Sequence, residues 1–248
     1  MRSKQNIIEM IQSVKNWYHQ IEIRPGIVTP GINNSAEVLK LLDLPEDCKG
    51  MRAIDLGTRD GFFAFELEKR GAEVIAVDYM PKDKTGFKVA AELLNSKVTY
   101  KQDNIYNLSK ERYGEFDIVL FLGLLYHLPD PMKALNIVRT ICKDELYLET
   151  HVIDNAFLLP DGNKISLSNI SSKLEDIPIM QFFPRNSLNN DFTNYWGPNL
   201  KCMELMLMEN NFLIIEKKLK GERAILKCKV GLDHILEYHR KISRGIIT

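Results

Sequence analysis

The sequence predicts an α/β fold in which a mostly parallel sheet carries helices on both faces. Between about residues 50 and 150, short apolar segments of strand character alternate with segments of helical periodicity, which is the pattern of a parallel sheet. Gly57 and Gly61 follow the first of these strands, where glycine permits a tight turn into a helix. The 248 residues, 45% hydrophobic and 27% charged, are enough for one large globular domain.

The N-terminal region precedes this alternation. Ile7, Ile8, Ile11 and Val14 recur at helical spacing and predict a helix. Residues 17–31 contain two prolines and two glycines, which favour turns and an extended path. A short helix is expected over 35–42, so residues 1–45 form an N-terminal helical cap.

The alternating region supplies five strands. They are expected at residues 51–56, 73–77, 97–100, 116–121 and 145–149, with helices at 62–70, 86–95 and 131–142. Pro131 suits the first turn of the last of these helices.

The pattern breaks after the fifth strand. Residues 151–199 have no clear period and are too long for a simple connection, so we expect a functional insertion, a lid or a partly mobile segment. Periodicity then returns, with a helix at 200–209, strands at 212–216 and 224–228, and a polar helix at 232–242.

Charge and cysteine content narrow the class of protein. Lys plus Arg and Asp plus Glu both number 33, and this balance disfavours nucleic acid as the main partner. The four cysteines form no C-x-x-C pair, so reduced thiols in a cytoplasmic protein are expected. The N-terminus lacks a signal-peptide pattern, and no apolar run is long enough to cross a bilayer.

The glycine loop at residues 57–61 is the sharpest motif. A dinucleotide site requires G-x-G-x-x-G, but Arg59 occupies the middle glycine position. Asp55 precedes the loop and suits a ligand with a cationic group rather than a pyrophosphate. An ordinary strand–helix turn remains the alternative for this loop taken alone.

Two further acids follow the next two strands. Asp78 ends the second strand, where a carboxylate accepts both ribose hydroxyls, and Asp103 follows the third, where it can accept from an adenine amino group. Each acid by itself is also explained as a helix cap or a surface residue. Because Asp55, Asp78 and Asp103 follow successive parallel strands, we expect them to line one crevice that holds an adenosyl group.

These residues resemble the class I S-adenosylmethionine-dependent methyltransferases over about residues 50–150. A narrower resemblance, to a bacterial branch similar to the tRNA wobble-uridine carboxymethyltransferase and to sugar and natural-product methyltransferases, is carried by residues 17–23, 29–31, 57–63, 125–131, 149–150 and 194–199. The resemblance implies a Rossmann-like methyltransferase fold with a seven-stranded sheet in a single domain, 1–248. Within it, 50–150 is the cofactor-binding half, 151–199 a substrate-side insertion, and 200–248 a helix, a strand pair and a tail.

The resemblance also implies the ligand contacts. The expected cofactor-binding residues are Trp17, Tyr18, Asp55, Gly57, Thr58, Gly61, Asp78, Tyr79, Met80, Asp103, Asn104, Ile105 and Leu122. The carboxymethyltransferase holds a carboxylated cofactor through a Lys, a Tyr and an Arg. Tyr126 and Arg223 match the last two, but His19 stands near the position of the Lys, which favours ordinary S-adenosylmethionine and weakens tRNA as the acceptor.

A hydroxyl acceptor must lose a proton, which a histidine can take. We expect His151 to be this base, with a structural histidine as the alternative. Tyr126 and His19 are further catalytic candidates, and a core tyrosine and a packed capping segment are their alternatives. Tyr195 and Trp196 are expected to stack on the acceptor, with Arg223 as another substrate residue, or else to hold the insertion in place. No metal is predicted, because carboxylates such as Asp154 and Asp191 form no spaced ligand set.

Three functional hypotheses follow. The first is O-methylation of a small polar acceptor, such as a sugar, a nucleotide-sugar or a pathway intermediate. The second is a methyl- or carboxymethyltransferase that modifies the tRNA wobble uridine. The third is a non-catalytic module that binds S-adenosylmethionine and regulates a partner, because the acids and the glycine loop predict binding rather than turnover.

Overall fold

The computed structural model describes residues 2–243 and 245 of the chain. It divides into two compact units. Unit 1 comprises the chain up to residue 108 together with residues 116–120, and unit 2 comprises residues 109–115 and the chain from residue 121 onward.

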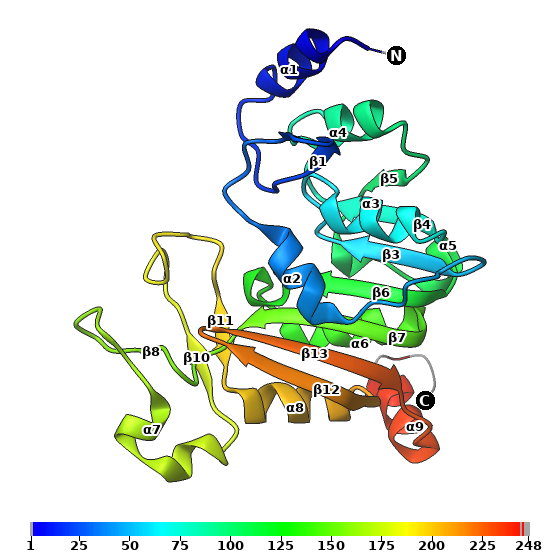
Figure 1. Cartoon of the computed structure of the whole chain (residues 1–248). Coiled ribbons are helices and arrows are strands. Elements are labelled where there is room, and N and C mark those ends of the chain that lie inside the picture. Colours follow the sequence, from blue (N-terminus) through cyan, green and yellow to red (C-terminus); the bar gives the residue numbers. More distant parts are fainter. Residues whose placement is uncertain (1, 244, 246–248) are drawn as a thin grey trace. The chain divides into compact units, whose positions relative to one another are not determined.

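The central sheet has seven strands in the order β12-β13-β7-β6-β3-β4-β5 (Figure 1). The strands are β3 (Arg52–Leu56), β4 (Glu73–Asp78), β5 (Thr99–Gln102), β6 (Phe116–Leu122), β7 (Cys142–His151), β12 (Phe212–Lys220) and β13 (Arg223–Val230). β3 pairs in parallel with β4, and β4 with β5, whereas β13 is antiparallel to both β7 and β12. The predicted Rossmann-like fold class is confirmed.

Unit 1 contains the strands β3, β4 and β5 and the elements around them. These elements are α1 (Lys4–Gln12), β1 (Glu22–Arg24), β2 (Ile27–Val28), α2 (Ser35–Leu42), α3 (Phe62–Lys69), α4 (Phe87–Leu94) and the 3₁₀ turn η1 (Ile105–Asn107). Ser3 caps α1 by accepting a hydrogen bond from the backbone N–H of Asn6, and the buried face of α1 packs beside α4 (Figure 1). β1 and β2 form a hairpin whose turn places Gly26 at φ +75°.

Unit 2 contains β7, β12 and β13, with α6 packed on β7 and α8 on β12. The helices and 3₁₀ turns outside the insertion are α5 (Lys110–Tyr113), η2 (Leu125–His127), α6 (Pro131–Ile141), α8 (Leu200–Glu209) and α9 (His234–Ser243). α9 is held through the buried Arg240, which donates to the backbone and side-chain oxygens of Asn136 and to the Glu237 carboxylate.

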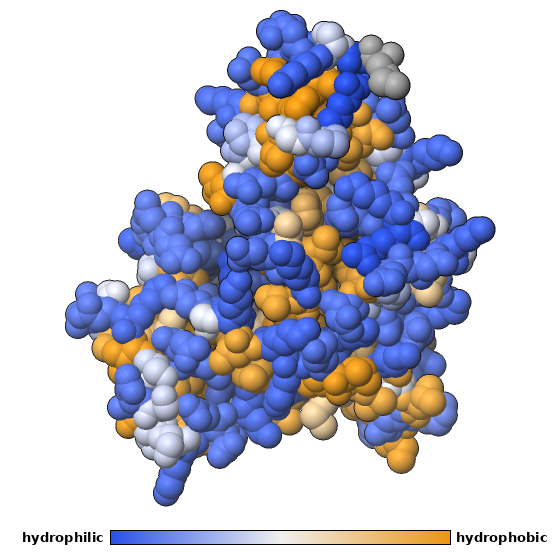
Figure 2. Space-filling model, in the orientation of Figure 1, coloured by the Kyte–Doolittle hydropathy of each residue, from blue (hydrophilic) through white to orange (hydrophobic). Residues whose placement is uncertain are grey.

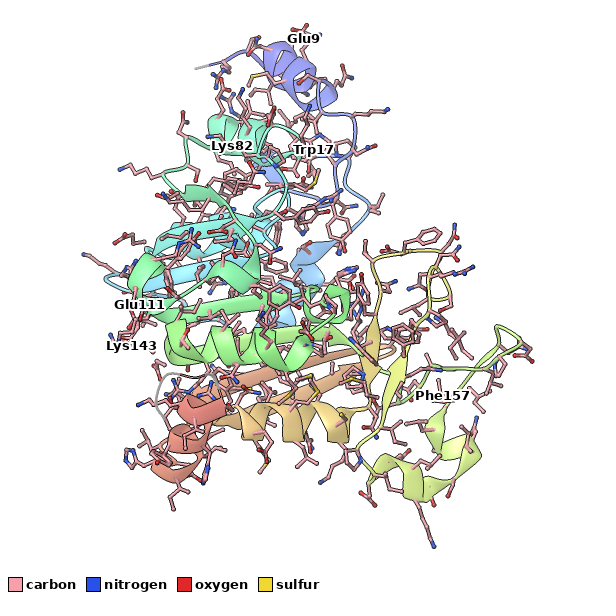
Figure 3. The ribbon with its side chains drawn as sticks, turned by 180° about the vertical axis from the view of Figure 1, so that it is seen from behind. Glu9, Trp17, Lys82, Glu111, Lys143 and Phe157 are labelled. Carbon is pink, nitrogen blue, oxygen red and sulfur yellow. The ribbon has the colours of Figure 1, made fainter. Side chains whose placement is uncertain are left out.

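The insertion after β7 also belongs to unit 2 and contains short elements that periodicity does not reveal. They are β8 (Phe157–Leu158), β9 (Lys164–Ile165), α7 (Leu167–Ile170), η3 (Ser172–Glu175), β10 (Met180–Phe182) and β11 (Trp196–Pro198). β8 pairs with β9 and β10 with β11 (Figures 1 and 3; Phe157 is labelled in Figure 3). A small core of Ile153, Leu167, Phe183 and Leu188 holds the insertion together.

Several predicted boundaries were wrong. The third strand was expected at 97–100 but runs from Thr99 to Gln102, because Lys97 and Val98 donate their backbone N–H groups to the Glu68 and Ser96 side chains instead of to a strand. The fifth strand was expected to end at residue 149 but continues to His151, because Arg223 on β13 pairs opposite that residue. Periodicity cannot show such extensions, since partner strands determine them.

Most of the surface in view is hydrophilic, and apolar groups gather around the insertion and α9 (Figure 2). On α9 and the turn before it, Leu232, Ile235 and Ile242 are exposed. Cys48, Cys142 and Cys228 are buried, and all four cysteines are free thiols. Over residues 2–243 and 245, none of the helices has the length and apolar character that a membrane crossing requires.

Candidate functional site

The glycine loop of unit 1 joins β3 to α3. Gly57, Arg59 and Gly61 all have positive φ values, +76°, +53° and +93°. A Cβ at Gly61 would lie 2.6 Å from the Phe65 ring, so only glycine fits between the loop and the helix. The backbone N–H groups of Gly57 and Thr58 donate to the carbonyl of Val77, which joins the loop to the end of β4.

Asp55 lies at the base of this loop and is fully buried. Its carboxylate accepts a hydrogen bond of 2.7 Å from the Thr58 hydroxyl. The pKa of Asp55 is raised to about 7: burial is the main cause and the nearby charge of Asp78 acts in the same direction, while the Thr58 hydrogen bond opposes the shift. The side chain therefore changes charge near neutral pH.

Asp78 and Asp103 stand at the ends of the two neighbouring strands. The Asp78 carboxylate accepts from the backbone N–H groups of Arg59 and Met80, both at 2.9 Å. The N–H of Asp103 donates to the carbonyl of Asp78, and the Asp103 carboxylate accepts from Asn104 and Asn107. In unit 1, Asp55 lies near the end of β3, Asp78 is the last residue of β4 and Asp103 directly follows β5, and these three strands are adjacent in the sheet.

Four other residues with predicted cofactor contacts surround this row in unit 1. Tyr79 is 65% exposed. The Met80 carbonyl accepts from the Tyr100 hydroxyl. The Asn104 side chain caps η1, and Ile105 is buried. Leu122 is the last residue of β6 and belongs to unit 2.

Asp60 was not predicted as a site residue, although it lies in the loop. It is completely buried, and one carboxylate oxygen accepts from the backbone N–H groups of Tyr18 (2.7 Å) and His19 (2.9 Å). The other oxygen accepts from the N–H of Gly86 at 2.8 Å. Asp60 thereby joins the loop to the N-terminal segment and to the start of α4. The presence of an acid inside the glycine loop was the one sequence signal for this role. The hydrogen-bond partners of Asp60 could not be predicted, because they lie far from it in the sequence.

The N-terminal segment packs closely on unit 1. The Trp17 ring covers Gly86, where a Cβ would lie 2.2 Å from the indole, and Figure 3 shows Trp17 beside the loop that carries Lys82. Tyr18 accepts through its hydroxyl from the Asn33 side chain. His19 is buried with its Nδ1 atom 3.9 Å from the Asp60 carboxylate, and burial lowers its pKa to about 4. The charge of the neighbouring Asp60 carboxylate opposes this shift of the His19 pKa.

The predicted base, His151, ends β7 in unit 2 and is 3% exposed. Its Nδ1 atom lies 3.8 Å from the Glu222 carboxylate. Its buried Nε2 atom has no hydrogen-bond partner among the described residues. Burial lowers the pKa of His151 to about 4, and the charge of Arg223 acts in the same direction. Both effects favour the neutral imidazole at neutral pH.

Tyr126 and Arg223 lie together in the same unit. The Arg223 guanidinium carbon is 4.7 Å from the centre of the Tyr126 ring, and its Nε atom is 3.4 Å from the Glu149 carboxylate. Tyr126 and His151 have ring centres 6.3 Å apart. Glu149 was not singled out as a site residue. Burial raises its pKa, and the charge of Arg223 opposes that shift.

Tyr195 and Trp196 make hydrogen bonds to different residues. The N–H of Tyr195 donates to the carbonyl of Tyr126, and the indole N–H of Trp196 donates to the carbonyl of Pro129. The aromatic partner of Trp196 is Phe182 on β10, with ring centres 5.0 Å apart. Phe182 was missed, because strand pairing across the insertion cannot be deduced from an aperiodic sequence.

The carboxylates near the insertion serve local structure. Asp154 accepts from the N–H of Leu200 at the start of α8, and Asp191 accepts from Thr193. Within residues 2–243 and 245, no group of three or more His, Cys, Asp or Glu side chains has an arrangement that could hold a metal ion.

Known proteins resemble the chain in sequence and in fold. The tRNA U34 carboxymethyltransferase of Campylobacter hominis is 31% identical over 131 residues, which cover 50% of this chain and 45% of that protein. The ubiquinone biosynthesis O-methyltransferase of Acinetobacter baylyi is 27% identical over 95 residues, 38% of this chain and 40% of that protein. The chain thus matches less than half the length of either relative.

Solved structures share the fold. The N-terminal domain of EvdMO1, crystallised with SAH, superposes with a TM-score of 0.62 over 93% of this chain and 98% of that one, at 16% identity. The magnesium protoporphyrin IX methyltransferase of Synechocystis PCC 6803 gives a TM-score of 0.53 over 79% of this chain and 77% of that one, also at 16% identity.

The family model described as a methyltransferase domain matches residues 33–195, about two thirds of the chain. This segment contains the glycine loop and the three acids of unit 1, as well as Tyr126 and His151 of unit 2. The chain belongs to the methyltransferase-domain family and has the fold of the class I S-adenosylmethionine-dependent methyltransferases.

Proposed function

We propose that this protein transfers a methyl group from S-adenosylmethionine to a hydroxyl oxygen of a small polar acceptor, such as a sugar, a nucleotide-sugar or a related pathway intermediate. Family membership supports the methyl-transfer reaction. The observation that carries the choice of a hydroxyl acceptor is His151, a buried, neutral imidazole whose Nε2 atom has no partner among the described side chains.

The residues of unit 1 fit the proposed donor. Asp55 suits the ammonium end of an amino acid, Asp78 suits the two ribose hydroxyls, and Asp103 suits the adenine amino group. Residues 57–62 read Gly-Thr-Arg-Asp-Gly-Phe and so lack the second and third glycines of G-x-G-x-x-G, in keeping with a ligand that has no phosphate. When bound, S-adenosylmethionine supplies a methyl group on a positively charged sulfur, which is already activated for displacement.

The acceptor requires a proton acceptor, and His151 provides one. As the acceptor oxygen forms a bond to the methyl carbon, the carbon–sulfur bond breaks with its electron pair going to sulfur, and the hydroxyl proton goes to Nε2. At neutral pH the imidazole is neutral and can accept this proton, but its pKa of about 4 makes it a weaker base than one whose pKa matches the working pH. Tyr126, with Arg223 against its ring, is the second proposed acceptor-side group.

Binding and transfer can be tested separately. Calorimetry with S-adenosylhomocysteine should detect binding to the wild-type protein, and Asp78→Ala should weaken it by about tenfold or more, because charge-assisted hydrogen bonds contribute about 1.5–3 kcal/mol. Transfer of labelled methyl groups should then be measured with a panel of sugars, nucleotide-sugars and phenols. His151→Ala should retain binding and lose transfer, while His234→Ala, on the exposed start of α9, should change neither. Full transfer by His151→Ala would refute the role of His151.

A second candidate function is modification of the tRNA wobble uridine. The 31% identity to a tRNA U34 carboxymethyltransferase favours it, although that match covers only half of this chain. Mass spectrometry of the nucleoside that copurifies with the protein distinguishes ordinary from carboxylated S-adenosylmethionine. Labelling of unmodified tRNA, with no labelling of small acceptors, would replace the first proposal with this one.

A further inference from the structure

Two charged side chains, Glu222 and Lys164, form a connected polar set with His151 in unit 2. Glu222 lies in the two-residue turn between β12 and β13, and the turn is joined to the residue after β7 by the N–H of Val152, which donates to the Glu222 carbonyl. The Glu222 carboxylate is 3.8 Å from Nδ1 of His151. Lys164, on the β9 strand of the insertion, contacts both oxygens of the same carboxylate at 2.8 and 3.0 Å.

We propose that Glu222 is a positioning residue that keeps the proton of His151 on Nδ1, and that Lys164 adjusts this effect by sharing the Glu222 carboxylate. This inference rests on the proposed role of His151 as the base. A neutral imidazole carries one N–H, so a carboxylate beside Nδ1 favours the form in which Nε2 holds the lone pair. Nε2 is the atom that has no partner in the described structure.

The charged groups around the imidazole act in opposite directions. Glu222 raises the pKa of His151, while Arg223, opposite it on β13, and Lys164 lower it. Tyr126 on η2 and Phe183 after β10 contribute ring contacts, and Glu149 lies two residues away on β7 beside Arg223. Because Lys164 belongs to the insertion, the basicity of His151 depends on how the β8–β9 hairpin contacts the β12–β13 turn.

The first experiment measures the tautomer directly. Long-range ¹H–¹⁵N spectra of the protein, assigned by the signal lost in His151→Asn, should show a protonated Nδ1 and an unprotonated Nε2 between pH 6 and pH 8. A protonated Nε2 in the wild-type protein would overturn the proposal. This readout does not require methyl transfer, so it tests Glu222 even if the proposed reaction is wrong.

The second experiment uses two variants with opposite expected effects. Glu222→Gln removes the negative charge and should move the titration midpoint of the His151 ring protons to lower pH, by about half a pH unit or more. Lys164→Met leaves the carboxylate to His151 alone and should move the midpoint to higher pH. The acid limb of kcat against pH should follow the same two directions if His151 is the base.

An exposed ion pair in the same unit provides the control. Lys110 and Glu115 are 2.7 Å apart, and Glu115→Gln and Lys110→Met should leave the His151 midpoint unchanged. Glu222→Ala should lower kcat about tenfold or more with little change in the acceptor KM, and Glu222→Asp should restore part of the loss. Identical midpoints in the wild type, Glu222→Gln and Lys164→Met would overturn the inference. If the His151 titration midpoints shift but the acid limb of kcat does not, Glu222 still acts on His151, and the role of His151 as the base is refuted.

Discussion

At the scale of single residues, Asp60 accepts hydrogen bonds from distant segments that no sequence motif indicated. Its two carboxylate oxygens accept three backbone N–H groups, from Tyr18, His19 and Gly86. Asn has only one acceptor oxygen, so Asp60→Asn would leave at least one buried N–H unpaired. We expect it to lower the free energy of unfolding by about 1–3 kcal/mol in urea titrations.

The matched control for Asp60→Asn is Asp83→Asn, because Asp83 is exposed and precedes Gly86 in the same loop. That variant should unfold at the wild-type urea concentration. If the N-terminal segment forms one side of the donor site, Asp60→Asn should also weaken the binding of S-adenosylhomocysteine more than Asp83→Asn does. Equal stability of the two variants would contradict the role given to Asp60.

Asp55 predicts a pH dependence of stability. Its folded-state pKa of about 7 lies above its ordinary value, so the folded protein retains a proton that the unfolded chain releases near pH 4. The stability that this proton provides is complete below about pH 4 and is lost as the pH rises to about 7. The side chain introduced by Asp55→Asn does not titrate, so this variant does not lose stability in this way. Between about pH 4 and pH 7, its free energy of unfolding relative to wild type should therefore rise by an amount on the order of 3–4 kcal/mol. Urea unfolding at several pH values measures the difference, and a constant difference would show that Asp55 titrates normally.

At the scale of secondary-structure elements, the contact between Trp17 and Gly86 holds the N-terminal segment on α4. Gly86 has an ordinary φ of −73°, so an alanine there is excluded by the indole ring alone. We expect Gly86→Ala to destabilise the protein by about 1–3 kcal/mol through overpacking. Thermal unfolding of Gly86→Ala, Trp17→Phe and the double variant should reveal a favourable coupling, because the smaller ring makes room for the methyl group. Additive losses would show that the two side chains do not compete for space.

The β10 strand offers an internal comparison between its two faces. Phe183, just after the strand, is buried in the small core of the insertion, whereas Phe182 is half exposed. Phe183→Ala should cost about 3–5 kcal/mol by opening a cavity. Hydrogen exchange should therefore increase across 153–199 while the amides of α3 stay protected. Phe182→Ala should leave exchange in the insertion core nearly unchanged, and similar exchange in both variants would contradict a separate core.

At the scale of the whole molecule, the balance of charges separates the two acceptor classes. Lys plus Arg and Asp plus Glu both number 33, so the protein has no overall attraction to phosphates. We expect tRNA binding, measured by fluorescence anisotropy, to disappear between about 50 and 200 mM salt. Tight tRNA binding that persists at 200 mM salt would favour the wobble-uridine function instead.

The alternating pattern of residues 50–150 was sufficient to predict five of the seven strands of the sheet, and the glycine loop with the three acids pointed to the family. These features are local: a buried parallel strand is a short apolar run, and the carboxyl ends of parallel strands share one edge. Asp55, Asp78 and Asp103 could therefore be assigned to one row without any contact being known.

The amino-acid sequence by itself determined the fold class, the methyltransferase family and the row of acids in unit 1. Only the tertiary structure decided that Asp60 binds Tyr18 and His19, that Phe182 is the ring partner of Trp196, and that Glu222 and Lys164 lie beside His151. Those contacts join residues 14 to 71 positions apart, and burial sets the pKa values of His151 and Asp55. Side-chain contact and burial depend on how distant segments pack, and no local pattern encodes them.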